Sequence, residues 1–240
     1  MSFMLLISVL IIFSTIQSVL GVGLLVFGTP TLLIMGFSFE ETLSIVLPAS
    51  ICISLLQVIE PQKSGKSFRK EFNLFCLPFV FLGVYYVLLN EKNIDLSIYV
   101  GGMLFISGAI RLSSKLTTIL SSFIFQYRKL YQVILGLVHG LTNMGGGLLT
   151  LFSSSIHSGD KNSTRAGVAY GYLLMGVIQY GMLLFFHPEF ISIKIVLYVL
   201  IAAVSYLLFG KRLYVNTQEK LFHNSVTAII LFYGCVLIFR

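Results

Sequence analysis

Three consecutive glycines within an apolar run are the first residues in this sequence whose types and spacing could do chemistry. Gly145, Gly146 and Gly147 lie in the segment 137–155, which also carries several polar side chains. Each glycine costs about 1 kcal/mol relative to alanine inside a helix, so a triplet favours an intended break. A break inside a membrane frees backbone N–H and C=O groups, which survive there only if protein covers them or water reaches them. The pattern therefore predicts a polar cavity at this point of the chain.

The chemistry that such a break offers is anion binding. The free N–H groups at a helix N-terminus carry about half a positive charge, and glycine lets a ligand approach the backbone closely. Carriers of cations or protons commonly keep a carboxylate in the pathway, but every acidic residue here lies in or beside a predicted loop. These residues are Glu40, Glu41, Glu60, Glu71, Glu91, Asp95, Asp160, Glu189 and Glu219. We therefore expect a small anionic substrate.

Polar and basic side chains near the predicted breaks complete the candidate site. His139 could donate to an anion or carry a proton, or could be a packing histidine bonded to a carbonyl. Asn143 could cap a half-helix or touch the substrate. Arg165 could attract an anion, although membrane orientation alone also predicts a basic residue at the start of a span. The residues predicted to bind substrate are Gly21, Gly23, Thr29, His139, Asn143, Gly145, Gly146, Gly147, Ser153 and Arg165.

Composition sets the class of protein. Of the 240 residues, 57% are hydrophobic and 10% charged, with a mean hydropathy of +0.94, which indicates a polytopic all-α integral membrane protein. The net charge of +7 comes from residues at the ends of spans, so no nucleic-acid partner is expected. The sequence contains no P-loop, H-E-x-x-H or G-x-S-x-G motif and no clustered metal ligands. We therefore expect neither an enzyme nor a cofactor.

The elements that must position the candidate residues are about eight membrane spans, or nine if the segment 116–127 also crosses. That segment could instead be an interfacial helix. The first apolar run, 1–35, contains glycine interruptions at 21–23 and 28, and is either one bent element or a helix followed by a shorter one. The predicted spans cover residues 1–35, 42–59, 72–89, 96–110, 130–156, 166–186, 191–209 and 221–239.

The two glycine-interrupted segments predict two pseudo-repeats, 1–112 and 130–240, with 113–129 as a linker or short membrane segment. A shift of 124 residues aligns 21–25 with 145–149 and places Thr29 on Ser153. Basic residues alternate between the corresponding loops of the two halves, which favours an inverted arrangement. Paired, interrupted segments in two halves usually indicate a transporter site at the repeat interface.

The motifs G-x-G-L-L-V-x-G-T-P at 21–30 and M-G-G-G-L-L-T at 144–150, the latter followed by R-A-G at 165–167, resemble those of the sulfite exporter TauE/SafE family. The resemblance covers nearly the whole chain. It implies a bacterial or archaeal inner-membrane permease for small anions, often sulfite or organosulfonates and sometimes small carboxylates, driven by an ion or proton gradient. The first motif has fewer glycines than the family pattern, and Glu40 and Glu41 stand where a basic residue often precedes the span. The range 143–147 is therefore the better candidate for the site.

These observations predict a secondary-active transporter of a small anion in the bacterial inner membrane. Sulfite, an organosulfonate or another sulfur-containing anion is the expected cargo, with a coupling ion or proton and the lipid bilayer as further partners. A homo-oligomer is left open. The alternatives are a small-carboxylate transporter, a channel, and a non-transporting scaffold or assembly subunit in which the glycines only allow helices to pack closely.

Overall fold

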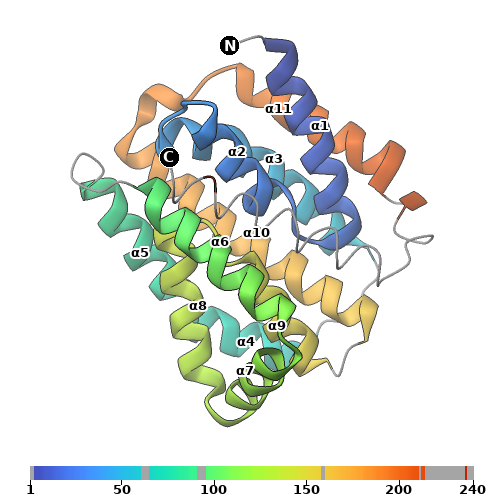
Figure 1. Cartoon of the computed structure of the whole chain (residues 1–240). Helices are drawn as coiled ribbons and strands as arrows, with labels where there is room; N and C mark the ends of the chain where they lie inside the picture. The colour runs from blue at the N-terminus through green and yellow to red at the C-terminus, as the bar shows by residue number, and fades with distance from the viewer. Residues whose placement is uncertain are drawn as a thin grey trace.

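The computed structural model describes residues 3–60, 65–90, 96–157, 160–210, 212–213 and 236. Within these residues every regular element is a helix and no strand occurs (Figure 1). The predicted span 221–239 lies outside the described residues except for position 236, as do parts of the predicted loops 63–70, 90–95 and 211–220.

The helices of the first half run from α1 to α6. Their bounds are α1 Phe3–Leu20, the π-helical turn η1 Leu24–Gly28, α2 Thr29–Ile34, α3 Phe39–Ile59, α4 Lys66–Phe75, α5 Leu77–Asn90 and α6 Leu96–Leu112. The remaining helices are α7 Ser114–Gln126, α8 Arg128–Thr142, α9 Gly146–Ile156, α10 Lys161–Phe186, the 3₁₀ turn η3 Pro188–Phe190, α11 Lys194–Ser205 and the π-helical turn η4 Tyr206–Gly210.

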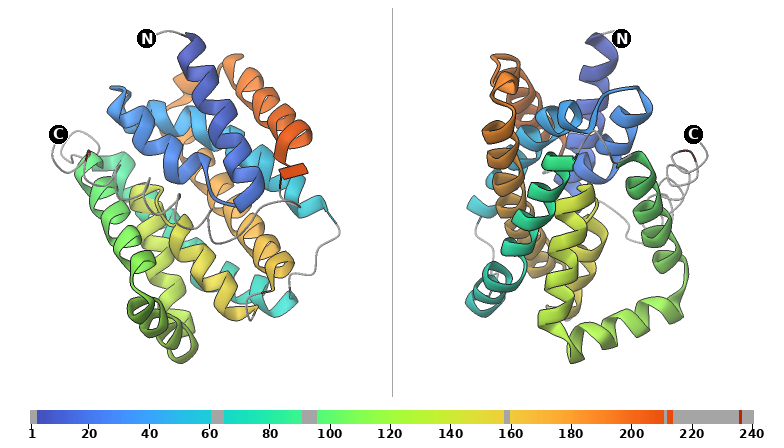
Figure 2. Two further views of the ribbon diagram at one scale, coloured as in Figure 1. Left: turned by 45° about the vertical axis from the view of Figure 1, so that its right-hand side comes forward. Right: turned by 90° about the vertical axis from the view of Figure 1, so that its left-hand side faces the viewer.

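Three described helices are long and apolar enough to cross a membrane. They are α3, the pair α4–α5 and α10. A fourth would be α6 together with α7, although the two are bent by 101° at the break between them (Figure 2, right). The other apolar helices in the described part of the chain are shorter than a full span. The structure therefore agrees with a multi-pass membrane protein, and the predicted count of eight or nine spans is not confirmed.

The helices α3 and α10 pack against each other at the centre of the molecule. Each begins at a residue that caps its free N–H groups. Ser38 and Glu41 form a capping box at the start of α3, with bonds of 3.1 Å from the Glu41 N–H to Ser38 Oγ and 2.8 Å from the Ser38 N–H to Glu41 Oε2. Asp160 Oδ2 accepts from the Ser163 N–H at 2.8 Å to start α10.

Landmarks of the two halves recur 122 residues apart. The caps Ser38 and Asp160 have this separation, and so do the helix ends Ile34 and Ile156. The packing recurs as well. In the first half, α5 packs on α8 and α10 of the second half, and in the second half, α11 packs on α1 and α3 of the first (Figures 1 and 2). The sequence predicted an offset of 124. The offset is two residues smaller because the second break begins at Asn143, two residues before the glycine triplet. The repeat boundaries at 112 and 130 stay predictions.

Candidate functional site

The second break separates α8 from α9, and side chains of the break itself satisfy its freed backbone groups. Asn143 has left-handed backbone, with φ 59°, and its N–H donates to the His139 carbonyl at 2.8 Å. The Met144 N–H donates to Thr142 Oγ1 at 3.1 Å, and the Gly145 N–H donates to His139 Nδ1 at 3.2 Å. These hydrogen bonds satisfy the backbone N–H groups of the break, which need partners because they are buried. The next N–H groups, which belong to the first turn of α9, have no partner inside their helix.

The first break separates α1 from η1 and has the same plan. Gly21, the counterpart of Asn143, also has left-handed backbone, with φ 77°. Gln17 Oε1 accepts from the Leu24 N–H at 3.2 Å, as His139 Nδ1 accepts from Gly145. Gln57 and Gln179, also 122 residues apart, donate to the carbonyls of Gln17 at 3.4 Å and of His139 at 3.0 Å respectively. Gln17 and His139 therefore hold equivalent places in the two halves.

The two breaks meet in the interior of the protein. Thr29 is the first residue of α2, and its Oγ1 accepts a hydrogen bond of 3.0 Å from Asn143 Nδ2. Both residues are fully buried. A Cβ atom at Gly146 would collide with the Tyr172 hydroxyl of α10 and would lie 2.8 Å from Val26 Cγ2 of η1. The start of α9 is thus fixed against elements of the first half and against α10.

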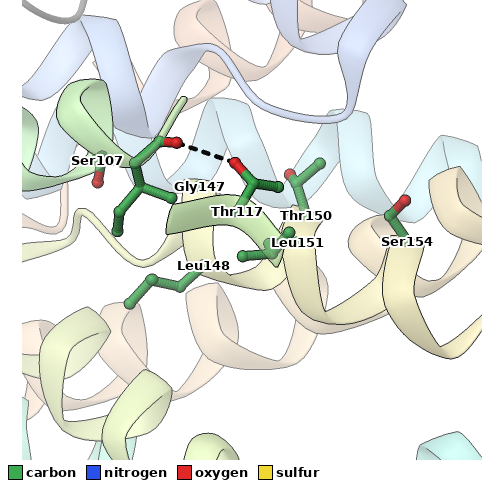
Figure 3. Close-up of a pocket in the computed structure, with 8 residues that line it drawn as sticks. Ser107, Thr117, Gly147, Leu148, Thr150, Leu151 and Ser154 are labelled. Carbon is green, nitrogen blue, oxygen red and sulfur yellow. Dashed lines mark hydrogen bonds between the residues drawn. The ribbon is translucent and has the colours of Figure 1, made fainter. Parts of the chain in front are cut away.

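A cavity of about 230 Å³ lies between α9 and the helices α6 and α7 (Figure 3). Its polar lining consists of hydroxyl groups from three helices, and none of its lining residues is charged. Pockets for drug-sized ligands are larger, at roughly 300–1,000 Å³, so this cavity suits a small ion. The lining residues are Ser107, Ile110, Thr117, Gly147, Leu148, Thr150, Leu151 and Ser154.

Two of these hydroxyls have partners within the wall of the cavity. Thr117 Oγ1 donates to the Ile110 carbonyl at 3.0 Å, as drawn in Figure 3, and Thr150 Oγ1 donates to the Gly146 carbonyl at 2.9 Å. Each of these oxygens keeps acceptor capacity, and the hydroxyl can rotate its proton toward a ligand. The wall can therefore offer neutral hydrogen-bond donors around the N-terminal turn of α9.

A family model described as Sulfite exporter TauE/SafE matches residues 5–237. The chain belongs to this family. Comparisons with curated proteins and with solved structures gave no match. Membership of the TauE/SafE family, together with the apolar helices, indicates a multi-pass membrane permease or exporter of sulfur anions rather than an enzyme.

The three glycines at 145–147 of this TauE/SafE chain have different surroundings. Two of them pack against other residues and one lines the cavity. A Cβ at Gly145 would lie 2.6 Å from the Cβ of His139, and Gly146 contacts Tyr172, so both glycines permit close packing. A Cβ at Gly147 would meet nothing closer than Ser107 Oγ at 3.7 Å. Of the three glycines, Gly147 is therefore the one that opens on the cavity.

The glycines of the first break are packed rather than open. A Cβ at Gly21 would lie 3.0 Å from Val168 Cγ1, and a Cβ at Gly23 would collide with the backbone N of Gln17. The N–H of Leu24 is already bonded to Gln17. The substrate-binding role of Gly21 and Gly23 stays a prediction, and at both positions the neighbouring chain leaves no room for a side chain.

Ser153 lies away from the junction of the breaks. It is fully buried near the C-terminal end of α9, where its Oγ donates to the Thr164 carbonyl at 2.9 Å and lies 3.3 Å from His157 Nδ1. It faces α10, whose Gly167 lies against its Oγ, whereas the next residue, Ser154, lines the cavity. The structure therefore does not bring Ser153 to the other candidate residues.

Arg165 lies beside the C-terminal end of α1. Its Nη2 donates to the Ser18 carbonyl at 3.1 Å, and its Nη1 lies 3.5 Å from Glu60 Oε2. The Tyr206 hydroxyl donates to the other oxygen of Glu60 at 2.6 Å. A cation is favourable where a helix presents its last carbonyls, so the position of Arg165 fits a role in holding α1. The structure does not place its guanidinium at the cavity.

Several residues around the cavity and the start of α9 are not among those predicted from the sequence to bind substrate. Ser107 and Thr117 line the cavity from α6 and α7, and Tyr172 contacts Gly146 from α10. The spacing of Gly147, Thr150 and Ser154 on one face of α9 was a signal in the sequence, because residues three and four apart share a helix face. The contributions from other helices depend on tertiary packing and had no comparable signal.

Proposed function

We propose that this member of the TauE/SafE family is a secondary-active transporter that binds a small oxyanion in the cavity at the start of α9. Sulfite, an organosulfonate or another sulfur-containing anion is the proposed cargo, and an ion or proton gradient the proposed driving force. We place the protein in the inner membrane of a bacterial cell, with about eight spans in two inverted repeats.

The observation that carries this proposal is an uncharged cavity at the N-terminal turn of an 11-residue helix. The N–H groups of Gly147 and Leu148 belong to that turn, and the positive end of the α9 dipole favours an anion there. The hydroxyls of Ser107, Thr117 and Ser154 supply further neutral donors. A site without lysine or arginine binds an anion without a fixed ion pair, which suits a carrier that must also release its cargo.

The packing of α9 supports alternating access. The start of the helix is held by Thr29 and Val26 of the first half and by Tyr172 of α10, whereas α6 and α7 form the far wall of the cavity. Movement of one group of helices against the other would therefore change the cavity's access without dismantling α9. Broken helices at a repeat interface are the usual framework for such movement.

The proposal is tested by placing a cysteine in the cavity wall. In a background without the native cysteines, Ser154→Cys should react with a small anionic thiol reagent in proteoliposomes. The modification should abolish saturable uptake of labelled sulfite, and sulfite should slow the labelling. Thr118→Cys, on the exposed face of α7, is the matched control, and its treatment should leave uptake unchanged.

Tight packing at the glycines favours one other function, a non-transporting scaffold subunit. Gly83 and Gly140 bring α5 and α8 into backbone contact, since a Cβ at Gly140 would lie 2.9 Å from the Gly83 Cα. In a scaffold the cavity would have no ligand, so uptake would be absent and sulfite would not slow labelling of Ser154→Cys. Protection by a small carboxylate but not by sulfite would instead identify a carboxylate carrier.

A further inference from the structure

The two breaks are equivalent in plan but differ in one chemical property. Gln17 and His139 each accept the N–H at the start of the following half-helix, and each carbonyl accepts from a glutamine of a neighbouring helix. A glutamine cannot change its charge. A histidine can gain a proton within the physiological range. The half-helix that borders the cavity, α9, is thus held by the one of the two residues that can titrate.

The hydrogen bond of His139 defines its protonation state in this structure. A backbone N–H can only donate, so Nδ1, which accepts from Gly145, is unprotonated and the proton of the neutral ring is on Nε2. Nε2 has no hydrogen-bond partner among the described residues, and the side chain is fully buried. The Tyr172 hydroxyl, on the ring whose centroid is 6.0 Å away, also has no described partner.

The surroundings of His139 contain polar but uncharged groups. From α10 they are Tyr172 and Gln179, from the residue before α9 Gly145, and from α5 the backbone near Val80 and Gly83, which contacts Gly140. Among the described residues no acidic or basic side chain forms an ion pair with His139. A buried imidazolium would therefore lack a countercharge in the protein itself, and such a charge is costly.

An anion in the cavity would supply the missing countercharge. Gly145, which bonds to His139, is two residues from Gly147, which lines the cavity, so the imidazole and the bound anion would share the first turn of α9. We propose that His139 is a proton-binding site, that its proton binds together with the anion, and that this coupling makes the transporter a proton–anion symporter. This inference rests on the function proposed above.

The proton acts through the contact with Gly145. When Nδ1 takes up a proton from the aqueous side, it becomes a donor and can no longer accept the Gly145 N–H. The ring then carries protons on both nitrogens and one positive charge, and the N-terminal end of α9 loses its tether. Release of the anion removes the countercharge, the proton leaves Nδ1, and the Gly145 bond forms again. One proton is bound and one is released in each cycle.

The test uses anions of strong acids, because their charge does not change with pH as that of sulfite does. The dissociation constants of methanesulfonate and sulfate are measured for the purified protein between about pH 5 and pH 8. The affinity of the wild type should rise as pH falls, by up to about tenfold per pH unit. By linkage, the wild type should take up about one proton for each anion that it binds. Calorimetry in buffers of different ionisation enthalpy measures this proton uptake.

The chain offers a matched variant for this test. His139→Gln copies the residue that fills the same place in the first half, so it can still accept the Gly145 N–H. At every pH it should bind the anion only as weakly as wild type does at about pH 8, and it should take up no proton. His187→Gln replaces a half-buried histidine after the end of α10 that pairs with Glu189, and it should keep both the pH dependence and the proton uptake.

Two results would overturn the inference while leaving the proposed function intact. One is wild-type binding that is independent of pH and takes up no proton, and the other is a full pH dependence in folded His139→Gln protein. If sulfite, sulfate and methanesulfonate all failed to bind the folded wild type at any pH, the proposed function itself would be overturned, and this inference with it.

Discussion

Asn143 and Gly21 show how single residues produce the two breaks. Both have left-handed backbone, but Asn143 also donates to Thr29 and so links the second break to α2. Left-handed backbone costs most non-glycine residues about 1–2 kcal/mol, and asparagine tolerates it better than most. The second half thus uses a residue that both ends α8 and connects the two halves.

Substitution of Asn143 should separate these two contributions. Asn143→Ala loses the hydrogen bond and strains the backbone, whereas Asn143→Gly, which copies Gly21, loses only the bond. We expect Asn143→Ala to be the less stable variant by about 1 kcal/mol. Thermal unfolding in detergent measures the difference. Equal stability of the two variants would show that the left-handed backbone at 143 does not govern the break.

The sequence predicted the break from its glycine triplet but not the role of each glycine. The cost of glycine in a helix depends on local chain properties and is readable from residues 145–147. Which glycine faces a cavity depends on the rotation of α9 relative to α6 and α7. That rotation is set by packing of Tyr172 and Val26 against Gly146, which no local pattern encodes. The partners of Ser153 and Arg165, which bond to carbonyls of α10 and α1 rather than line the cavity, likewise depend on tertiary packing.

At the scale of elements, the start of α10 depends on the cap at Asp160. Hydrogen bonds from the side chain and backbone of Ser163 lower the pKa of the Asp160 carboxyl below its usual value. A carboxyl whose pKa is lower in the folded state stabilises the protein above its unfolded-state pKa. This contribution is lost as pH falls through the folded-state pKa.

Asp160→Ala should therefore destabilise the protein at neutral pH. The difference in stability between this variant and wild type should shrink as the pH falls below the usual pKa of an aspartate. Unfolding by heat at a series of pH values measures it. The corresponding Ser38→Ala variant loses a cap without a charge change at residue 38, so its effect should depend less on pH. A deficit in Asp160→Ala that stayed constant with pH would contradict the role of the charged cap.

Long apolar helices were the most predictable elements. The predicted spans 42–59 and 166–186 correspond to α3 and α10, and 72–89 lies within the pair α4–α5. The interruption of the first apolar run is confirmed, because α1 is followed by η1 and α2. The segment 116–127 is helical as α7, but composition could not predict its bend of 101° from α6, because that angle is set by packing against α8 and α9.

At the scale of the whole molecule, contacts between distant segments hold the broken helices in place. Asn143 joins Thr29 across 114 residues, and Arg165 joins Ser18 across 147. The reciprocal packing of α5 on α8 and of α11 on α1 makes each half depend on the other. The cavity at α9 is therefore a product of the assembled chain, although the residues that suggested an anion site lie within one short segment.

The most direct test of the account is anion-dependent stabilisation of wild type and Gly147→Val. A ligand that binds only the folded protein raises its stability, by about 2.7 kcal/mol at a concentration of 100 times the dissociation constant. A valine at 147 extends into the cavity, whereas Gly181→Val on α10 is the matched control at a glycine with open surroundings. Sulfite should raise the unfolding temperature of wild type and Gly181→Val but not of Gly147→Val. Equal stabilisation of all three proteins would contradict an anion site at the start of α9.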